Sequence, residues 1–321
     1  MSVSFHIATL ATGLLTFTPT GLAPAVQISL RWTHQFRKHS LIGAIYHNGA
    51  HAHHIYDYSK LRAPNVLSTI ELLKLASLYQ PKSIHYISTL DVAFDQDEHY
   101  LLESFPSILP PENAVGYHLT KWTSEKILSD AQKKGFPVTL YRPPQIMGHS
   151  VTGVSPTDNI HIFLLIKGCI ELGIAPYGNF YTTMLPVDFI ARFICLSSLE
   201  KEVINKVYNL SVSPCPSLTQ MFEQLIEQGY DIRLIPYKKW KKEVIKKIKP
   251  KNPLFPLLPL YLQENIEEAM ELNPLIKTHN FETMLSKLKI PLPNLDRQLL
   301  TTYFNFLEHW WGKPTVELTE R

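Results

Sequence analysis

The chain has 321 residues, of which 45% are hydrophobic and 18% are charged, so it is an ordinary globular protein with room for one large or two modest domains. Its net charge of +3 is too small to indicate a nucleic-acid partner, and the interrupted apolar stretch over residues 1–30 predicts neither a signal peptide nor a membrane span. The three cysteines, Cys169, Cys195 and Cys215, lack metal-ligand spacing and are typical of a reducing compartment, so we expect a cytoplasmic protein.

The first half of the chain alternates short apolar strands with helices that have one apolar face. The pattern predicts strands over 41–46, 83–87 and 136–141, and helices over 65–78 and 117–133. Strands that alternate with helices of this length indicate βαβ units and a parallel sheet with right-handed crossovers. We therefore expect an α/β fold in this part of the chain.

Beyond residue 145 the pattern becomes mostly helical. Helices are predicted over 159–170, 186–199, 217–229 and 299–311, and one further strand is predicted over 207–210. A serine, Ser217, stands where it can cap the third of these helices. This part of the chain is expected to form a smaller, mostly helical domain.

Tyr117 and Lys121 stand one helical turn apart and point to chemistry on a carbonyl group. Residues four apart share a helix face, so Lys121 can lie beside Tyr117 and lower a phenol pKa that is ~10 when unperturbed. Ser88 and Thr89 follow the predicted strand 83–87, and open α/β sheets place their sites at such strand ends. The Thr89 hydroxyl can bind the same oxygen atom as Tyr117. Although the Tyr-x-x-x-Lys pattern alone also occurs on ordinary helix surfaces, the order of strand, hydroxyl, helix and strand favours carbonyl reduction by hydride transfer.

Several motifs occur together in the order found in extended short-chain dehydrogenases/reductases. They are Ala44-Ile-Tyr-His-Asn-Gly-Ala50, Asn65-Val-Leu-Ser-Thr69, His85-Tyr-Ile-Ser-Thr89, Gly116-Tyr117 with Lys121-Trp122 and Glu125-Lys126, Tyr141-Arg-Pro143 with Ile146 and Gly148, and Pro186-Val-Asp188. Over residues 41–321 the chain therefore resembles this family, and in particular the thioester reductase domains of peptide synthetases and carboxylic acid reductases.

The resemblance implies a fold, a reaction and a set of site residues. It implies an incomplete Rossmann-type parallel sheet with a smaller, mostly helical C-terminal substrate domain. Thr89 and Tyr117 would bind and protonate the carbonyl oxygen, and Lys121 would hold the nicotinamide ribose and tune Tyr117. Further cofactor contacts would come from Asn48, Gly49, Ala50, Ser88, Arg142 and Pro143. The implied reaction is the reduction by NADPH of an acyl thioester to an aldehyde or alcohol. The acyl group would be carried on the phosphopantetheine arm of an acyl or peptidyl carrier protein.

The N-terminal segment departs from the family pattern. The family begins with a strand and a Thr-Gly-x-x-Gly-x-x-Gly turn that meets the pyrophosphate, but Thr9–Thr16 keeps only the middle glycine, Gly13. Only 27 residues separate Gly13 from Leu41, whereas one βαβ unit takes ~30 residues. We expect an atypical segment over 1–40 in place of the dinucleotide-binding start. The alternative function is a truncated, non-catalytic remnant or carrier-docking module that cannot bind the dinucleotide.

The division of the rest of the chain into domains follows from the resemblance to this family. Residues 41–150 are expected to form the rest of the Rossmann-like domain, and 151–321 the substrate domain, of which 180–212 returns to the sheet. An open sheet edge is a further consequence, which 1–30 would have to cover.

Three lesser patterns leave alternatives open. The histidines His47, His51, His53 and His54 lack a carboxylate or cysteine at ligand spacing, so no metal site is expected. The eight lysines of 238–251 form a basic helix that could attract an acidic carrier protein or a membrane surface, or could simply face solvent; the overall expectation includes no membrane partner. The proline-broken run 253–259 could border an acyl tunnel or pack as core.

Overall fold

The computed structural model describes residues 5–10, 14–19, 43–53, 55–78, 81–92, 100–110, 114–157, 160–263, 266–271 and 275–311. The chain divides into two units. Unit 1 comprises Met1–Pro144, Arg192–Leu210 and Pro274–Ile290, and unit 2 comprises Gln145–Ala191, Ser211–Asn273 and Pro291–Arg321.

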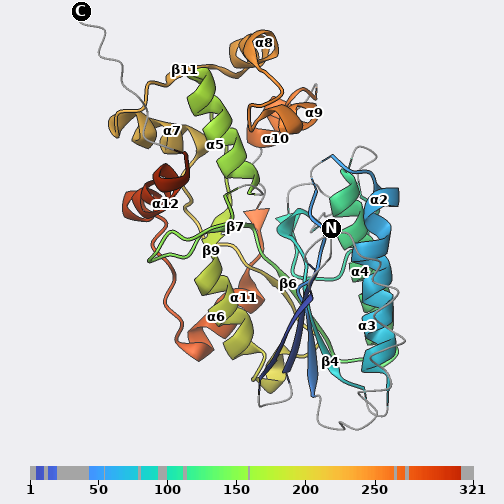
Figure 1. Ribbon diagram of the computed structural model, residues 1–321. Coiled ribbons are helices and arrows are strands. Elements are labelled where there is room, and N and C mark those ends of the chain that lie inside the picture. The colour runs from blue at the N-terminus through green and yellow to red at the C-terminus, as the bar shows by residue number, and fades with distance from the viewer. Residues whose placement is uncertain are drawn as a thin grey trace, which may run out of the picture. The chain divides into compact units, whose positions relative to one another are not determined.

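Unit 1 is built on a mainly parallel sheet (Figure 1). Over the described residues its strand order is β1-β2-β3-β4-β6-β10. The strands are β1 (Phe5–Leu10), β2 (Leu14–Pro19), β3 (Ala44–His47), β4 (Ser83–Ile87), β6 (Val138–Arg142) and β10 (Val207–Asn209). All neighbours from β2 to β10 run parallel, and β1 pairs antiparallel with β2. The α/β class with a parallel sheet, predicted from the alternating elements, is confirmed.

The sheet forms because its strands are short, apolar and rich in branched and aromatic residues. Every residue of β6 is buried, as expected for a parallel strand that is covered on both faces. The core of unit 1 gathers apolar side chains from the strands and the helices beside them: Ile45, Ala76, Ile84, Tyr86, Leu128, Val138, Leu140 and Val207.

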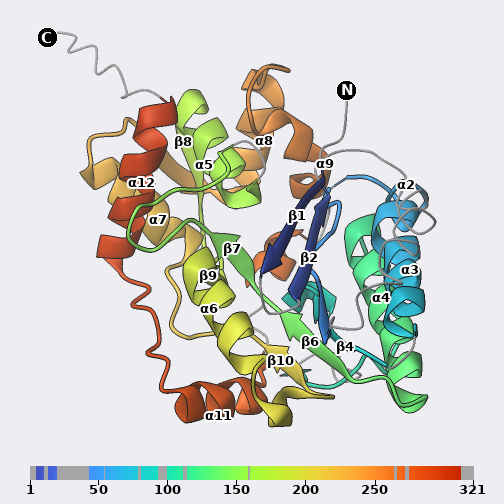
Figure 2. The same cartoon turned by 60° about the horizontal axis from the view of Figure 1, so that its bottom comes forward.

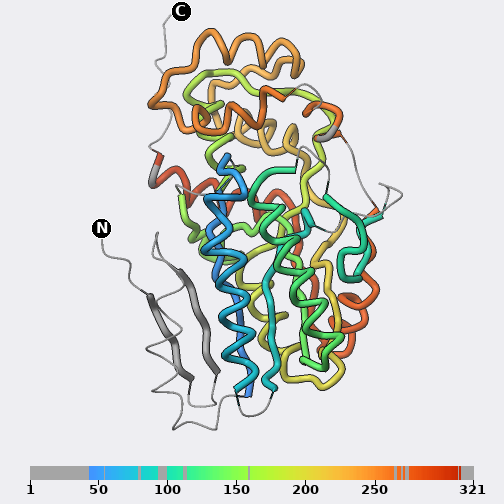
Figure 3. The backbone as a smooth tube through the Cα atoms, turned by 90° about the vertical axis from the view of Figure 1, so that its right-hand side faces the viewer, coloured from blue at the N-terminus to red at the C-terminus, as the bar shows by residue number. Residues whose placement is uncertain are grey.

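A long helical run follows β3 and packs beside a second helix. It consists of α2 (Tyr58–Arg62), a π-helical turn η2 (Ala63–Leu67) and α3 (Ser68–Ala76), and it lies alongside α4 (Gly116–Lys133) (Figure 3). Asp57 caps its start by accepting a hydrogen bond from the Lys60 amide. The predicted helix start at Asn65 was wrong. A proline such as Pro64 usually marks a helix boundary, because it has no N–H donor, but here the wider π turn accommodates it.

The other elements of unit 1 come from distant parts of the chain. They are η3 (Leu90–Val92), β5 (Tyr100–Leu101), η4 (Lys201–Val203), β12 (Leu275–Ile276), α11 (His279–Leu288) and the second half of α6 (Val187–Ser197). Phe193 and Phe281 meet edge to face at 4.9 Å, and the Asn280 amide donates to the Val207 carbonyl at 3.0 Å, so α11 is fixed against α6 and β10.

Unit 2 is mostly helical with two small parallel strand pairs, β7 (Gln145–Met147) with β9 (Met184–Pro186) and β8 (Ile174–Tyr177) with β11 (Arg233–Pro236). Its helices are α5 (His161–Leu172), α7 (Leu218–Glu227), α8 (Tyr237–Lys247), η5 (Phe255–Leu257), α9 (Leu258–Tyr261), α10 (Ile266–Glu271) and α12 (Arg297–Trp311). Figure 2 shows α5, α7 and α12 gathered around β8. Ser217 caps α7 in a reciprocal capping box with Gln220, as its position predicted. In the part of the chain that is described, no helix has the length and apolar character needed to cross a membrane.

Candidate active site

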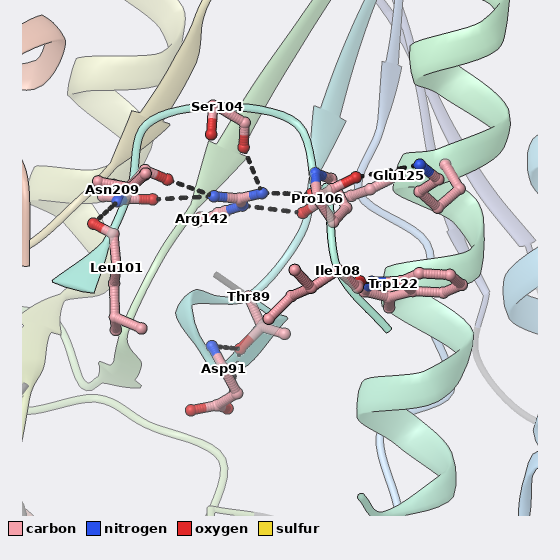
Figure 4. A network of polar contacts seen from close by, with 12 residues as sticks. Thr89, Asp91, Leu101, Ser104, Pro106, Ile108, Trp122, Glu125, Arg142 and Asn209 are labelled. Atoms are coloured by element: carbon pink, nitrogen blue, oxygen red, sulfur yellow. Dashed lines mark hydrogen bonds and ion pairs between the residues drawn. The ribbon is translucent and has the colours of Figure 1, made fainter. Parts of the chain in front are cut away.

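The C-terminal end of β4 carries the two predicted hydroxyl residues. The Ser88 amide donates to the Tyr141 carbonyl at 2.7 Å and the Leu90 amide donates to the Pro143 carbonyl at 2.9 Å, so this segment is held against β6 and the turn that follows it. Thr89 is buried, and its Oγ1 donates to Oδ2 of Asp91 at 3.0 Å. The Thr89 Oγ1 also accepts from the Asp91 amide at 3.4 Å (Figure 4). The Thr89 hydroxyl is therefore oriented by a carboxylate that the sequence analysis did not single out.

The same carboxylate reaches the first turn of α4. Asp91 Oδ2 lies 3.3 Å from Nε2 of His118, the residue after Tyr117. Burial and the negative charge of Asp91 both raise the pKa of the Tyr117 phenol above its ordinary value. Asp91 thus links the Thr89 hydroxyl to the first turn of α4, and the raised pKa keeps the Tyr117 phenol protonated at neutral pH.

Lys121 is buried beneath β4. Its Nζ donates to the Ile87 carbonyl at 2.6 Å and lies 4.1 Å from the centroid of the Tyr86 ring. Burial lowers the pKa of Lys121 to about 7, against the opposing effect of Glu125. We expected this ammonium to lower the pKa of Tyr117, but the Tyr117 pKa is raised, because burial and Asp91 govern it while the lysine is held at the strand carbonyl. The Lys121 charge instead lowers the pKa of His47, where burial has the larger effect.

The loop after β3, with the predicted cofactor residues Asn48, Gly49 and Ala50, is fixed by a buried asparagine in η2. The Asn65 side chain accepts from the His51 amide at 2.7 Å, and its Nδ2 donates to the His51 carbonyl at 3.1 Å and to Thr120 Oγ1 at 2.9 Å. Asn65 therefore joins this loop to the residue before Lys121. In the sequence Asn65 appeared only as part of a motif. The one local indication of its role was that it is a polar residue in an otherwise apolar helix pattern.

Two buried polar atoms at the strand ends have no hydrogen-bond partner among the described residues. They are Nδ1 of His47, at the end of β3, and Oγ of Ser88, just after β4. Buried polar groups are nearly always paired, so an unpaired one needs an explanation, such as a ligand. In open α/β sheets, ligands bind at the carboxyl ends of the strands. The two atoms therefore fit a polar ligand in this region, and Ser88 is one of the predicted cofactor residues.

Arg142 is buried and uses its whole guanidinium within unit 1 (Figure 4). Nε and Nη2 bind the Glu125 carboxylate at 3.0 and 2.6 Å. Nη1 donates to the Leu102 carbonyl and to Asn209 Oδ1, and Nη2 also donates to the Ser104 carbonyl. The side chain of Arg142 thus holds the 101–104 segment in place, so any cofactor contact of the Arg142-Pro143 turn would come from its backbone or from Pro143.

The remaining candidates take ordinary structural places. His53 stacks on Tyr56 with ring centroids 3.5 Å apart, and among the described residues no group of His, Cys, Asp or Glu could hold a metal ion; His54 lies outside them. In the run 253–259, Leu254 and Leu257 are buried in the core of unit 2. The helix α8 buries Tyr237, Trp240 and Val244 and leaves most of its lysines exposed.

Comparison with known proteins places this chain in a family. The profile of the family described as Male sterility protein, an NAD-binding family, matches residues 33–194. L-2-aminoadipate reductase of Saccharomyces cerevisiae is 32% identical over 246 residues, which are 71% of this chain and 18% of that protein. The chain thus spans about a fifth of the length of this curated relative.

Two solved structures have a similar fold. The terminal R domain from the myxalamid PKS-NRPS biosynthetic pathway has a TM-score of 0.78 and 30% identity, covering 90% of this chain and 73% of that chain. A thiolation-reductase di-domain from an archaeal non-ribosomal peptide synthetase has a TM-score of 0.73 and 18% identity, covering 88% and 61%.

Proposed function

Because this chain belongs to the Male sterility protein family of NAD-binding domains, we propose that it reduces an acyl thioester, carried on the phosphopantetheine arm of a carrier protein, to an aldehyde or alcohol. The proposal takes NADPH as the hydride donor and Thr89, Tyr117 and Lys121 as the catalytic residues. The observation that carries it is that Asp91, just after β4, accepts a hydrogen bond from Thr89 and lies 3.3 Å from His118, the neighbour of Tyr117 on α4, at the edge where parallel α/β sheets place their sites.

The relatives support the kind of substrate. One similar protein is named a reductase of L-2-aminoadipate, and one similar structure contains a thiolation domain joined to a reductase domain. A thiolation domain is a carrier, so an acyl or peptidyl carrier protein is the partner that we propose.

The residues at the ends of β3 and β4 would hold the nicotinamide half of the cofactor. Ser88 offers an unpaired buried hydroxyl, and the Asn48–Ala50 loop is fixed through His51 and Asn65. Lys121 binds the Ile87 carbonyl directly before Ser88, and burial lowers its pKa to about 7. When bound, the cofactor would supply the hydride to the thioester carbon, and the C–S bond would then break, releasing the phosphopantetheine thiol and leaving the aldehyde.

The chain's own residues would handle the substrate oxygen. The Tyr117 phenol, protonated at neutral pH because its pKa is raised, donates a hydrogen bond to that oxygen and then its proton. Thr89 binds the same oxygen once its hydroxyl turns from Asp91.

We expect the purified chain to bind NADPH and to consume it with an acyl-pantetheine thioester. Tyr117→Phe should lower kcat by about 100-fold or more, because it removes the proton donor, while NADPH affinity stays within about twofold. The matched control is Tyr177→Phe, which removes a phenol that is 56% exposed and should leave both unchanged. Equal activity of Tyr117→Phe and the unsubstituted chain would contradict the assignment of Tyr117.

A second candidate function is a carrier-docking module that does not bind the dinucleotide. It is favoured by the two N-terminal strands, because β1 pairs antiparallel with β2, with Leu10 opposite Leu14 in the register. Phe5–Leu10 and Leu14–Pro19 are both strands. The usual pyrophosphate site is instead a strand followed by a glycine-rich turn and a helix. Titration with millimolar NADPH separates the candidates: no binding, together with retained carrier affinity, supports docking alone.

A further inference from the structure

One buried amide joins two parts of unit 1 that lie far apart in the sequence. Asn65, in the π-helical turn η2, is 1% exposed. Its Oδ1 accepts from the His51 amide at 2.7 Å, while its Nδ2 donates to the His51 carbonyl at 3.1 Å and to Thr120 Oγ1 at 2.9 Å. A backbone N–H can only donate, so the oxygen of the Asn65 amide must face it, and the nitrogen must face the two oxygen atoms. The orientation of this amide is therefore fixed by its partners.

Thr120 continues the connection into the first turn of α4. This residue is 0% exposed, and its Oγ1 donates to the Tyr117 carbonyl at 2.7 Å. Because the single hydroxyl hydrogen is used there, Oγ1 acts as an acceptor toward Asn65, which agrees with the Nδ2 donor that faces it. An unbroken chain of hydrogen bonds thus runs from His51 through Asn65 and Thr120 to the backbone of Tyr117.

The backbone of Asn65 is held by the two helices beside it. Its carbonyl accepts the Thr69 hydroxyl of α3 at 2.9 Å and the Ser124 hydroxyl of α4 at 3.1 Å. The second of these bonds crosses from α4 to η2, so both the side chain and the main chain of Asn65 are tied to α4. A π-helical turn is rare and often marks a functional site.

We propose that Asn65 is a positioning residue that holds the Asn48–Ala50 loop at a fixed spacing from Tyr117, a role that rests on the proposed function. His51 directly follows this loop, which is the proposed cofactor contact, and Tyr117 is the proposed proton donor. The hydride and the proton have to reach the two atoms of one carbonyl group, and a misplacement of ~1 Å can cost about 100-fold in rate. Asn65 acts on this spacing through His51 and Thr120 and does not itself contact the substrate.

Substitutions at Thr120 test the connection on the purified full chain without any cofactor. Thr120→Val removes the hydroxyl and keeps the branched shape, so the hydrogen of the His51 amide, which lies beyond Asn65, should exchange about 10-fold or more faster, as followed by NMR. Thr120→Ser retains the hydroxyl and should leave this exchange unchanged. Thr120→Ala removes the same hydroxyl if the valine variant does not fold.

The matched control is Thr123→Val on the same helix. The Thr123 hydroxyl donates to the Leu119 carbonyl at 2.7 Å, within α4, and the variant should leave exchange of the His51 amide unchanged. The Ile84 amide, which donates to the Pro137 carbonyl at 2.9 Å, reports any general loss of stability. An increase at His51 in Thr120→Val that is no larger than the increase at Ile84 would overturn the inference.

The positioning role has a kinetic signature that a purely structural role lacks. Thr120→Val should lower kcat with an acyl-pantetheine thioester by about 10- to 100-fold, while the Kd of NADPH stays within about threefold, because the loop keeps its cofactor contacts and loses its spacing from Tyr117. Calorimetry measures the Kd. Thr120→Ser should restore kcat, and an equal kcat for Thr120→Val and Thr123→Val would overturn the role of Asn65.

The two measurements distinguish failure of this role from failure of the proposed function. Should the unsubstituted chain reduce no thioester, the proposed function fails, and the exchange of the His51 amide decides by itself whether Asn65 couples the loop to α4. Should the thioester be reduced equally by Thr120→Val and the unsubstituted chain, the proposed function stands and the role of Asn65 is overturned.

Discussion

Replacing Lys121 by methionine should change how the stability of unit 1 depends on pH. Lys121 is 1% exposed, and burial lowers its pKa from 10.5 to about 7. At ~1.4 kcal/mol per pH unit, this difference means that burying the ammonium costs about 5 kcal/mol below pH 7. Methionine keeps a long apolar side chain but leaves the Ile87 carbonyl without its donor, at a cost of ~1–3 kcal/mol. At pH 6.5 the variant should therefore be more stable by about 2–4 kcal/mol.

The sign of the pH dependence follows from the proton count. Between pH 7 and 10.5 the unfolded chain keeps the Lys121 proton that the folded chain has released, so raising the pH favours folding. From pH 7.5 to 9.5 the free energy of unfolding of the unsubstituted chain should rise by about 2–3 kcal/mol relative to Lys121→Met. Tyrosines and cysteines that also titrate in this range are common to both chains, so they cancel in the difference.

Urea unfolding followed by circular dichroism, at pH 6.5, 7.5, 8.5 and 9.5, measures this difference. Lys133→Met is the surface control, because the Lys133 side chain is 68% exposed; its stability should change by no more than about 0.5 kcal/mol. Parallel pH profiles for the unsubstituted chain and Lys121→Met would refute the claim that the ammonium is buried at a cost.

Two further predictions concern the Arg142 network and the basic helix. Glu125→Gln should lower the free energy of unfolding by about 3–5 kcal/mol in urea, because it leaves the Arg142 guanidinium buried without a counter-charge. Adding Arg142→Met should recover part of this loss, and a loss below about 1 kcal/mol in the single variant would contradict the reasoning. On α8, Lys239→Glu with Lys242→Glu should slow association with an acidic carrier protein about 10-fold at low salt, measured by stopped flow. Lys133→Glu with Lys134→Glu, at the C-terminal end of α4, is the matched control, and unchanged association of the α8 variant would exclude that surface.

The elements with the strongest local pattern could be predicted from the sequence. The strand Ser83–Ile87 has its predicted bounds, and α4 begins one residue before its predicted start. By contrast, β5 and β12 are two-residue strands that exist because they pair with each other, Leu275 with Tyr100, across 175 residues of chain. Such pairing leaves no local signal. The helix α11 was also not predicted.

The spacing of the motifs indicated which residues belong to the site, but the partners of these residues depend on tertiary structure. A helix-face argument placed Lys121 beside Tyr117, whereas burial brings its Nζ to the Ile87 carbonyl. Asp91 carried no sequence signal of its own, because a lone aspartate after a strand is common on protein surfaces. The roles of Thr89, Tyr117 and Lys121 in catalysis stay predictions, as do the cofactor contacts. The glycine-poor Gly13 turn lies outside the described residues.

The charged residues of α4 connect stability to the proposed chemistry. Lys121 and Glu125 stand four residues apart on one face of this helix, and Glu125 continues the row to Arg142 on β6. At one end of this row Lys121 binds the Ile87 carbonyl, directly before Ser88 and Thr89. At the other end Arg142 binds carbonyls of the 101–104 segment. Because burial lowers the pKa of Lys121 to about 7, we expect the charge at the first end to change near neutral pH, while the Glu125–Arg142 pair keeps the second end fixed. The hydroxyl of Thr89 is therefore the part of the site whose position should respond to pH, and the 101–104 segment the part that should not.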